Sequence, residues 1–230
     1  MLHKIYQAIR QGTPLTHAEV WQLINKEAQT KKKPISNILH KLFMYHNQGK
    51  TTNYFIPTAE TANQFIQILH KIKPTDILEI YAGRGLTSKL FTSIAQEAGI
   101  PYRATDNYMY GAPSTYTTVQ KITDQSALEK YANQKTLVVA ILPHYSKDTV
   151  KTLKKLIGKK CALYLVSYEG AGLDDAKEAL IKAGYKKHHL TTHAFVVGDY
   201  WIKTLLVKQA HSFANKKTGS NAQTMLFIKS

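Results

Sequence analysis

The chain has 230 residues, and its 31 lysines and arginines outnumber 15 aspartates and glutamates, which gives a net charge of +16. This length suits one α/β domain with a small extra module. The single cysteine, Cys161, excludes an internal disulfide and a cysteine-based zinc site. No apolar run reaches the roughly 18 residues of a membrane helix. The first residues also lack the apolar block of a signal peptide, so we expect a cytoplasmic protein with no membrane partner.

The basic surplus favours anionic partners, and nucleic acid is the first candidate because phosphate contacts need only clustered lysines and arginines. The alternative is that the charge serves solubility or reflects a lysine-rich source organism. We expect no metal site. His188, His189 and His193 have no cysteine or carboxylate nearby at ligand spacing, so surface histidines are the simpler interpretation.

Residues 1–55 predict an N-terminal helical module. Apolar side chains from Leu2 to Ile9 fall on one helical face. Thr16 and Glu19 have the spacing of a capping box, which begins a second helix. A third amphipathic helix is expected over 35–43, and a fourth from near Thr58 to His70.

From Pro74 onward, strands and helices alternate. Such alternation predicts a parallel sheet with right-handed crossovers, here over residues 56–230. The end of the chain reads as antiparallel, so the expected fold class is α/β: a Rossmann-like, mostly parallel sheet with an antiparallel C-terminal strand, plus the helical module. Strands are expected at 76–81, 102–105, 136–142, 162–167, 194–197, 201–208 and 224–228, and helices at 87–98, 126–131, 148–156 and 174–183.

The first of these strands runs into a glycine-containing turn, Glu79-Ile80-Tyr81-Ala82-Gly83-Arg84-Gly85. Gly83 and Gly85 would let the backbone approach a ligand without a Cβ clash. Asp106 ends the next strand, about 20 residues on, where an acid can bond ribose hydroxyls. The turn is not G-x-G-x-x-G, so a dinucleotide is disfavoured. The alternative is a tight turn without a ligand, with Asp106 as a cap.

This run resembles motif I of the class I S-adenosylmethionine-dependent methyltransferases, an acid followed by a short glycine-rich turn, and the resemblance covers roughly 74–230. It implies that the cofactor is S-adenosylmethionine. It also implies a role for each matching residue. Glu79 would contact the methionine end, Gly83 and Gly85 would pass beneath the cofactor, Asp106 would hold the ribose, and Asp124 would lie beside the adenine amine. Tyr81 replaces the first glycine of the turn and is counted with these cofactor-binding residues.

The segment after the fourth strand is Ile141-Leu142-Pro143-His144-Tyr145. Many nucleic-acid amino methyltransferases of the family carry an acid or amide there, before two prolines and an aromatic residue. Leu142 takes that polar position, so an exocyclic amine would lose its acceptor. His144 and Tyr145 are the catalytic candidates, with His144 as a general base near its ordinary pKa of about 6.5. The alternative is a loop histidine and a packing tyrosine.

The sequence therefore predicts an S-adenosylmethionine-dependent methyltransferase, with RNA before DNA as the first substrate class. A second hypothesis is a methyltransferase-like binding protein without turnover, which Leu142 motivates. A third is a small-molecule or protein methyltransferase, in which the N-terminal helices cover the site.

Overall fold

The computed structural model describes residues 2–43, 55–107, 115–142, 147–168, 173–196 and 222–229. The helices are α1 (His3–Arg10), α2 (His17–Lys31), α3 (Ile35–Phe43), α4 (Ala59–Ile72), α5 (Leu86–Glu97), α6 (Asp124–Tyr131), α7 (Lys147–Lys159) and α8 (Asp174–Lys182). The strands are β1 (Phe55–Ile56), β2 (Asp76–Ile80), β3 (Tyr102–Asp106), β4 (Gln120–Lys121), β5 (Thr136–Ile141), β6 (Ala162–Tyr168), β7 (Tyr185–Leu190), β8 (Phe195–Val196) and β9 (Ala222–Lys229).

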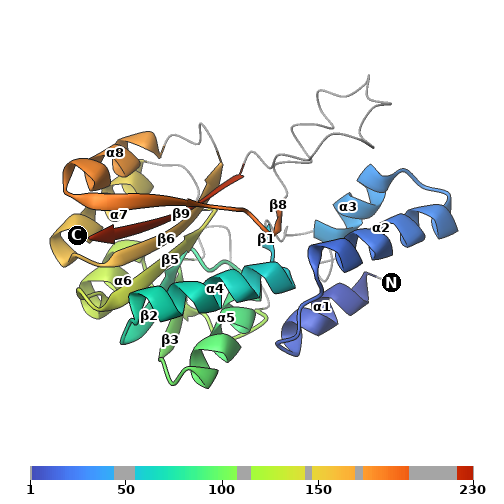
Figure 1. Cartoon of the computed structure of the whole chain (residues 1–230), viewed down its shortest axis with the longest axis horizontal. Coiled ribbons are helices and arrows are strands. Elements are labelled where there is room, and N and C mark those ends of the chain that lie inside the picture. The colour runs from blue at the N-terminus through green and yellow to red at the C-terminus, as the bar shows by residue number, and fades with distance from the viewer. Residues whose placement is uncertain are drawn as a thin grey trace.

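Seven strands form one sheet in the order β4-β3-β2-β5-β6-β9-β7 (Figure 1). β2 to β6 pair in parallel, and β9 lies antiparallel to both of its neighbours. The chain moves outward from β2 to β4 and then returns to β5 on the other side of β2. The strand order therefore reverses between β2 and β5, which is where open α/β sheets bind ligands. The predicted Rossmann-like fold with an antiparallel C-terminal strand is confirmed.

Helices cover both faces of this sheet, because successive side chains of a strand point to opposite faces. On β5, Leu137 belongs to the apolar cluster of α4 and α5, whereas Val138 belongs to that of α6, α7 and α8. Phe65 of α4 stacks on Phe91 of α5 with ring centroids 3.8 Å apart. The central strands are thus buried on both sides, and their carboxyl ends are held in fixed positions.

The first three helices pack beside α4 and α5 (Figure 1) and share one continuous apolar cluster with that face of the sheet. The predicted capping box is present at the start of α2, where Thr16 and Glu19 bond each other's backbone amides. The strand β1 pairs with β8, so Phe55 lies opposite Val196. The boundary expected between residues 55 and 56 falls inside this short strand and stays a prediction.

Most predicted elements are confirmed. The strands at 76–81, 102–105, 136–142, 162–167 and 224–228 appear within two residues, as β2, β3, β5, β6 and β9, and 194–197 appears as β8. The expected strand at 201–208 lies outside the described residues. The sequence did not predict β7, because Lys186-Lys187-His188-His189 has no apolar alternation. Its two ends, Tyr185 and Leu190, supply the apolar contacts of the strand.

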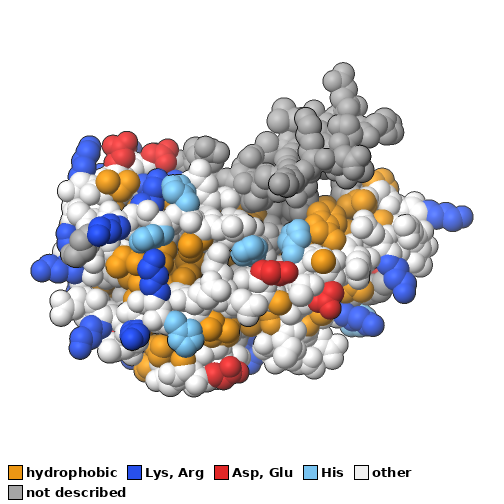
Figure 2. All heavy atoms as spheres, in the orientation of Figure 1, with side chains coloured by type: hydrophobic (Ala, Val, Ile, Leu, Met, Phe, Trp, Pro, Cys, Tyr) orange, Lys and Arg blue, Asp and Glu red, His pale blue; other side chains and the backbone are white. Residues whose placement is uncertain are grey.

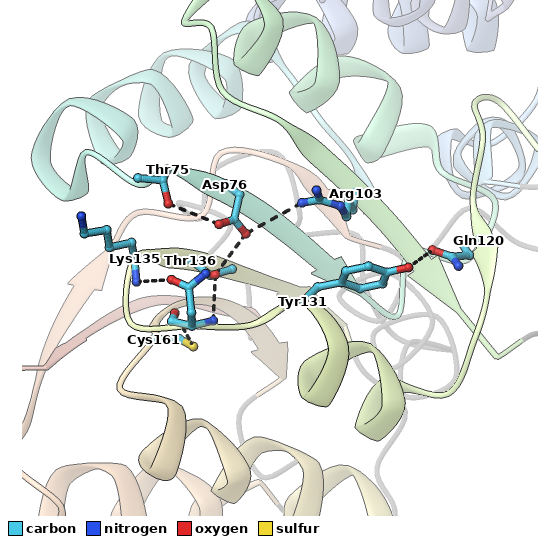
Figure 3. A network of polar contacts seen from close by, with 9 residues as sticks. Thr75, Asp76, Arg103, Gln120, Tyr131, Lys135, Thr136 and Cys161 are labelled. Atoms are coloured by element: carbon cyan, nitrogen blue, oxygen red, sulfur yellow. Dashed lines mark hydrogen bonds and ion pairs between the residues drawn. The ribbon is translucent and has the colours of Figure 1, made fainter.

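A polar network ties the amino ends of the central strands together (Figure 3). Asp76, at the start of β2, accepts a hydrogen bond from Thr136 of β5 at 3.0 Å and lies 4.0 Å from Arg103 of β3. The buried Cys161 donates to the carbonyl of Asn133 at 3.1 Å. These contacts lie at the opposite ends of the strands from the glycine-containing turn, so we assign them to stability. No helix within the described ranges is long and apolar enough to cross a membrane.

Candidate functional site

The turn after β2 has an unusual backbone, with three left-handed residues at alternate positions. Tyr81, Gly83 and Gly85 have φ angles of 62°, 53° and 73°. Glycine adopts this conformation without steric cost, whereas a residue with a Cβ is destabilised by roughly 1–2 kcal/mol. Tyr81 therefore carries backbone strain directly at the carboxyl end of β2. Such strain clusters at functional sites, where the surrounding structure holds it in place.

The two glycines serve different purposes. A Cβ built on Gly85 would lie 2.8 Å from Val119 and 3.0 Å from Thr117, so Gly85 is needed for close packing of residues 117–119. A Cβ built on Gly83 would meet no atom within 4 Å. No described residue therefore fills the space above Gly83, and its left-handed backbone is the surface that a ligand could approach.

Replacing Gly85 with alanine is expected to destabilise the fold by about 1–3 kcal/mol, since the new methyl group overpacks against Val119 and Thr117. Urea denaturation of the Gly85→Ala variant and of the wild-type chain measures this loss of stability. An unchanged unfolding midpoint would show that residues 117–119 do not pack on the turn as described.

Glu79 is the only acid of this turn and it is almost fully buried, with 1% of its surface exposed. Its Oε2 accepts hydrogen bonds from Ser88 of α5 and from Tyr102 of β3, the latter at 2.8 Å. Burial raises the pKa of Glu79 to about 7, against the stabilising effect of these two hydroxyl groups. Both hydroxyls bind one carboxylate oxygen, so the carboxyl group is fixed in orientation beside the open space.

Asp106 connects the acids of the site. Its Oδ2 accepts a hydrogen bond from the amide of Gly83 at 2.8 Å, which fixes the middle of the turn. The negative charge of Asp106 also helps to raise the pKa values of Glu79 and Asp124, so it is close enough to interact with both acids. The structure therefore brings together the three acids that the sequence singled out, from the ends of β2 and β3 and the start of α6.

Tyr81 of the turn and Asp124 of α6 form a second polar group of the site. Thr123 caps α6 by accepting from the amide of Ser126, which places Asp124 in the first turn of that helix. Burial raises the pKa of Asp124 to about 6, with a contribution from Asp106. The Tyr81 hydroxyl and Asp124 Oδ1 are buried, the two side chains interact with each other, and Thr149 and Thr152 also lie beside the hydroxyl. Asp124 is therefore a partly buried acid held next to the turn.

A pocket opens at the reversal of strand order. Glu79 and the turn line one wall, and Ile141 and Leu142, at the end of β5, line another. Phe55 of β1 joins the lining, so the segment that follows the first three helices reaches the site. Leu142 has a positive φ of 48°, and its amide donates to the carbonyl of Val166 at 2.8 Å. Leu142 is therefore a second residue, after Tyr81, that borders the pocket with a side chain on a strained, left-handed backbone.

The structure does not test every predicted residue. His144 and Tyr145 lie outside the described residues, so their catalytic roles stay predictions. Within the described ranges, no group of three or more histidine, cysteine or acidic side chains is arranged to hold a metal ion.

Sequence reasoning missed several residues of the site. Ser88 and Tyr102 orient Glu79, and Phe55 lines the pocket. Ser88 follows Glu79 by nine residues, in the first turn of α5, a position that can face the preceding strand and was therefore open to prediction. Phe55 has no sequence signal, because its place depends on the pairing of β1 with β8.

The fold matches solved structures, although no family model matches the chain and no curated protein is detectably similar in sequence. A precorrin-6y C5,15-methyltransferase from Geobacter metallireducens GS-15 aligns with 78% of this chain and 93% of that one, at 12% identity and a TM-score of 0.50. A putative caffeoyl-CoA O-methyltransferase from Staphylococcus aureus aligns with 91% and 98%, at 10% identity and the same TM-score. Against the citrinin polyketide synthase CMeT domain, with a TM-score of 0.46, the chain spans 57% of that chain's length. At such identities the likeness shows the fold alone.

Proposed function

We propose that this chain, which has the Rossmann-like fold of class I methyltransferases, binds S-adenosylmethionine at the turn after β2 and transfers its methyl group. The observation that carries the proposal is the turn itself. Gly83 presents a left-handed backbone to space that no described residue fills, and it does so beside a buried, oriented Glu79. The turn lies where the strand order reverses, the expected place for a nucleoside ligand.

The residues of the site suit the parts of this cofactor. Glu79 is an acceptor for the amino group of the methionine end, and its carboxyl is held by Ser88 and Tyr102. Asp124, which lies against the Tyr81 hydroxyl, is an acceptor for the adenine amine. When bound, the cofactor supplies an electrophilic methyl group. The role of Asp106 toward the ribose stays a prediction, since its Oδ2 already accepts from Gly83.

We propose a small organic acceptor with an apolar portion. The described pocket wall beyond Glu79 is formed by Phe55, Ile141 and Leu142, which offer apolar contact and no side-chain hydrogen bond. Methyl transfer depends mainly on in-line positioning, which proximity and packing can supply. A nucleic-acid acceptor, expected from the net charge of +16, is less well supported, because Phe55, Ile141 and Leu142 place no charged side chain on this wall. On the face shown in Figure 2, the lysines and arginines are scattered among apolar and uncharged surface.

Tritiated S-adenosylmethionine tests the proposal. The protein is incubated with cell extract, and label is counted separately in the RNA, DNA, protein and small-molecule fractions. We expect enzyme-dependent label in the small-molecule fraction. Salt-sensitive label in RNA would replace the small acceptor with the nucleic acid that the charge favours. Cofactor binding without transfer to any fraction would favour the binding protein that Leu142 motivated.

A further inference from the structure

Tyr116 links the first helix of the chain to the glycine-containing turn. The guanidinium carbon of Arg10, at the end of α1, lies 5.2 Å from the centroid of the Tyr116 ring. The guanidinium carbon of Arg84, within the turn, lies 4.9 Å from the same centroid. Tyr6 of α1 stacks on Tyr116 with centroids 6.1 Å apart and ring planes 14° apart. Two residues of α1 and one residue of the turn therefore share one aromatic ring.

The contact with the turn includes the backbone. The amide of Tyr116 donates to the carbonyl of Arg84 at 2.8 Å. Residues 117–119, which follow directly, pack so closely on Gly85 that no Cβ fits there. Any displacement of Tyr116 would therefore move the backbone on which Gly83 and Gly85 depend.

The helix α1 is itself held in a fixed place. Ile5, Tyr6 and Ile9 are each 1% exposed or less. The Tyr6 hydroxyl donates to the carbonyl of Leu42 at 2.6 Å, which ties α1 to α3. Gly12, just after α1, approaches Ser93 of α5, since its Cβ would lie 3.7 Å from that side chain. Tyr116 is thus held against a rigid support.

We propose that α1 is a positioning element of the cofactor site, in which Arg10 and Tyr6 hold Tyr116 and Tyr116 holds the turn. This inference rests on the proposed function and gives the N-terminal helices a role within it. A turn that is ordered before the ligand arrives loses less conformational freedom on binding, so affinity rises without a direct contact between α1 and the ligand.

Arg10 provides the test, because it is exposed and its replacement leaves the core intact. The variant Arg10→Leu removes the cation, and Arg10→Lys retains one. Lys4→Leu is the matched control, with the same loss of charge at another exposed position of α1. We measure the affinity for S-adenosylhomocysteine by calorimetry, hydrogen exchange at the Tyr116 amide, and the urea midpoint. For Arg10→Leu we expect binding weaker by about two- to fivefold, the range of one cation–π contact near a surface, and faster exchange by the same factor.

We expect wild-type behaviour from Lys4→Leu and at least partial recovery from Arg10→Lys. The urea midpoint of Arg10→Leu should fall only slightly, because the one contact it loses is worth about 0.5–1 kcal/mol in the folded state. Unchanged exchange at Tyr116 in Arg10→Leu would overturn the inference, and so would an equal effect of Lys4→Leu. If the wild-type chain binds no S-adenosylhomocysteine, the proposed function fails. The exchange measurement then still decides whether α1 orders the turn.

Discussion

Replacing Gly83 with alanine is expected to weaken cofactor binding by about 100-fold, or about 2.7 kcal/mol. The methyl group would enter space that no described residue fills within 4 Å, and in the proposed complex the ligand takes that space. The left-handed backbone adds strain of roughly 1–2 kcal/mol, which lowers the stability of the fold but leaves its architecture unchanged. Calorimetry with S-adenosylhomocysteine and urea denaturation measure the two effects separately.

Gly99 is the matched control for this substitution. It follows α5, has a φ of 68°, and its Cβ would also meet no atom of a described residue within 4 Å. The variant Gly99→Ala therefore carries the same kind of backbone strain away from the site. We expect a similar loss of stability with normal cofactor affinity. If Gly83→Ala bound the cofactor as well as Gly99→Ala does, the ligand would not lie against the turn.

Replacing Glu79 with glutamine is expected to remove much of the pH dependence of stability. Burial raises the pKa of Glu79 from an ordinary value of 4.5 to about 7, so the folded state favours the protonated acid. The wild-type chain is therefore most stable below the unfolded-state pKa, and it loses this contribution as the pH rises from about 4.5 to about 7. At roughly 1.36 kcal/mol per pKa unit, the difference corresponds to about 3 kcal/mol.

Glutamine can preserve the geometry, because Ser88 and Tyr102 both donate to one oxygen that the amide retains. We expect Glu79→Gln to be more stable than the wild type at pH 8 and similar to it at pH 4.5. A smaller slope will remain, since burial also raises the pKa of Asp124, to about 6. Urea denaturation across this pH range gives the comparison. Parallel curves for the two proteins would contradict the assigned pKa of Glu79.

The same substitution bears on the cofactor. The positively charged amino group of S-adenosylmethionine would favour the ionised form of Glu79, so wild-type affinity is expected to rise up to about pH 7. Binding at pH 6 should release a proton, which calorimetry detects as heat that varies with the buffer. Glu79→Gln should lose both the rise and most of the proton release.

Local sequence patterns predicted the central part of this fold. The turn from Glu79 to Gly85 and the unbroken apolar run of β5 identified the two strands that border the pocket. The structure brings Asp106, which ends β3, and Asp124, which begins α6, close to the turn, while their roles toward the cofactor stay predictions. Such signals are contained within a few residues, and the ordering of parallel strands then brings them together.

Contacts between distant segments were beyond prediction. The pairing of Phe55 with Val196 joins two-residue strands about 140 positions apart. A strand was expected at 194–197, but residues 55–56 carry no pattern that indicates this partner. The approach of Arg10 to Tyr116 depends on how a separate group of helices packs on α5. In β7, tertiary pairing with β9 overrides a polar sequence, because strand propensity depends strongly on context.

We propose that the turn after β2 holds S-adenosylmethionine, and titration calorimetry of the wild-type chain with S-adenosylhomocysteine measures this binding. We predict saturable binding at one site per chain, with a dissociation constant well below about 1 mM, weakened about 100-fold in Gly83→Ala but not in Gly99→Ala. The absence of binding heat at millimolar ligand would contradict this proposal, and so would an affinity that the Gly83 substitution leaves unchanged.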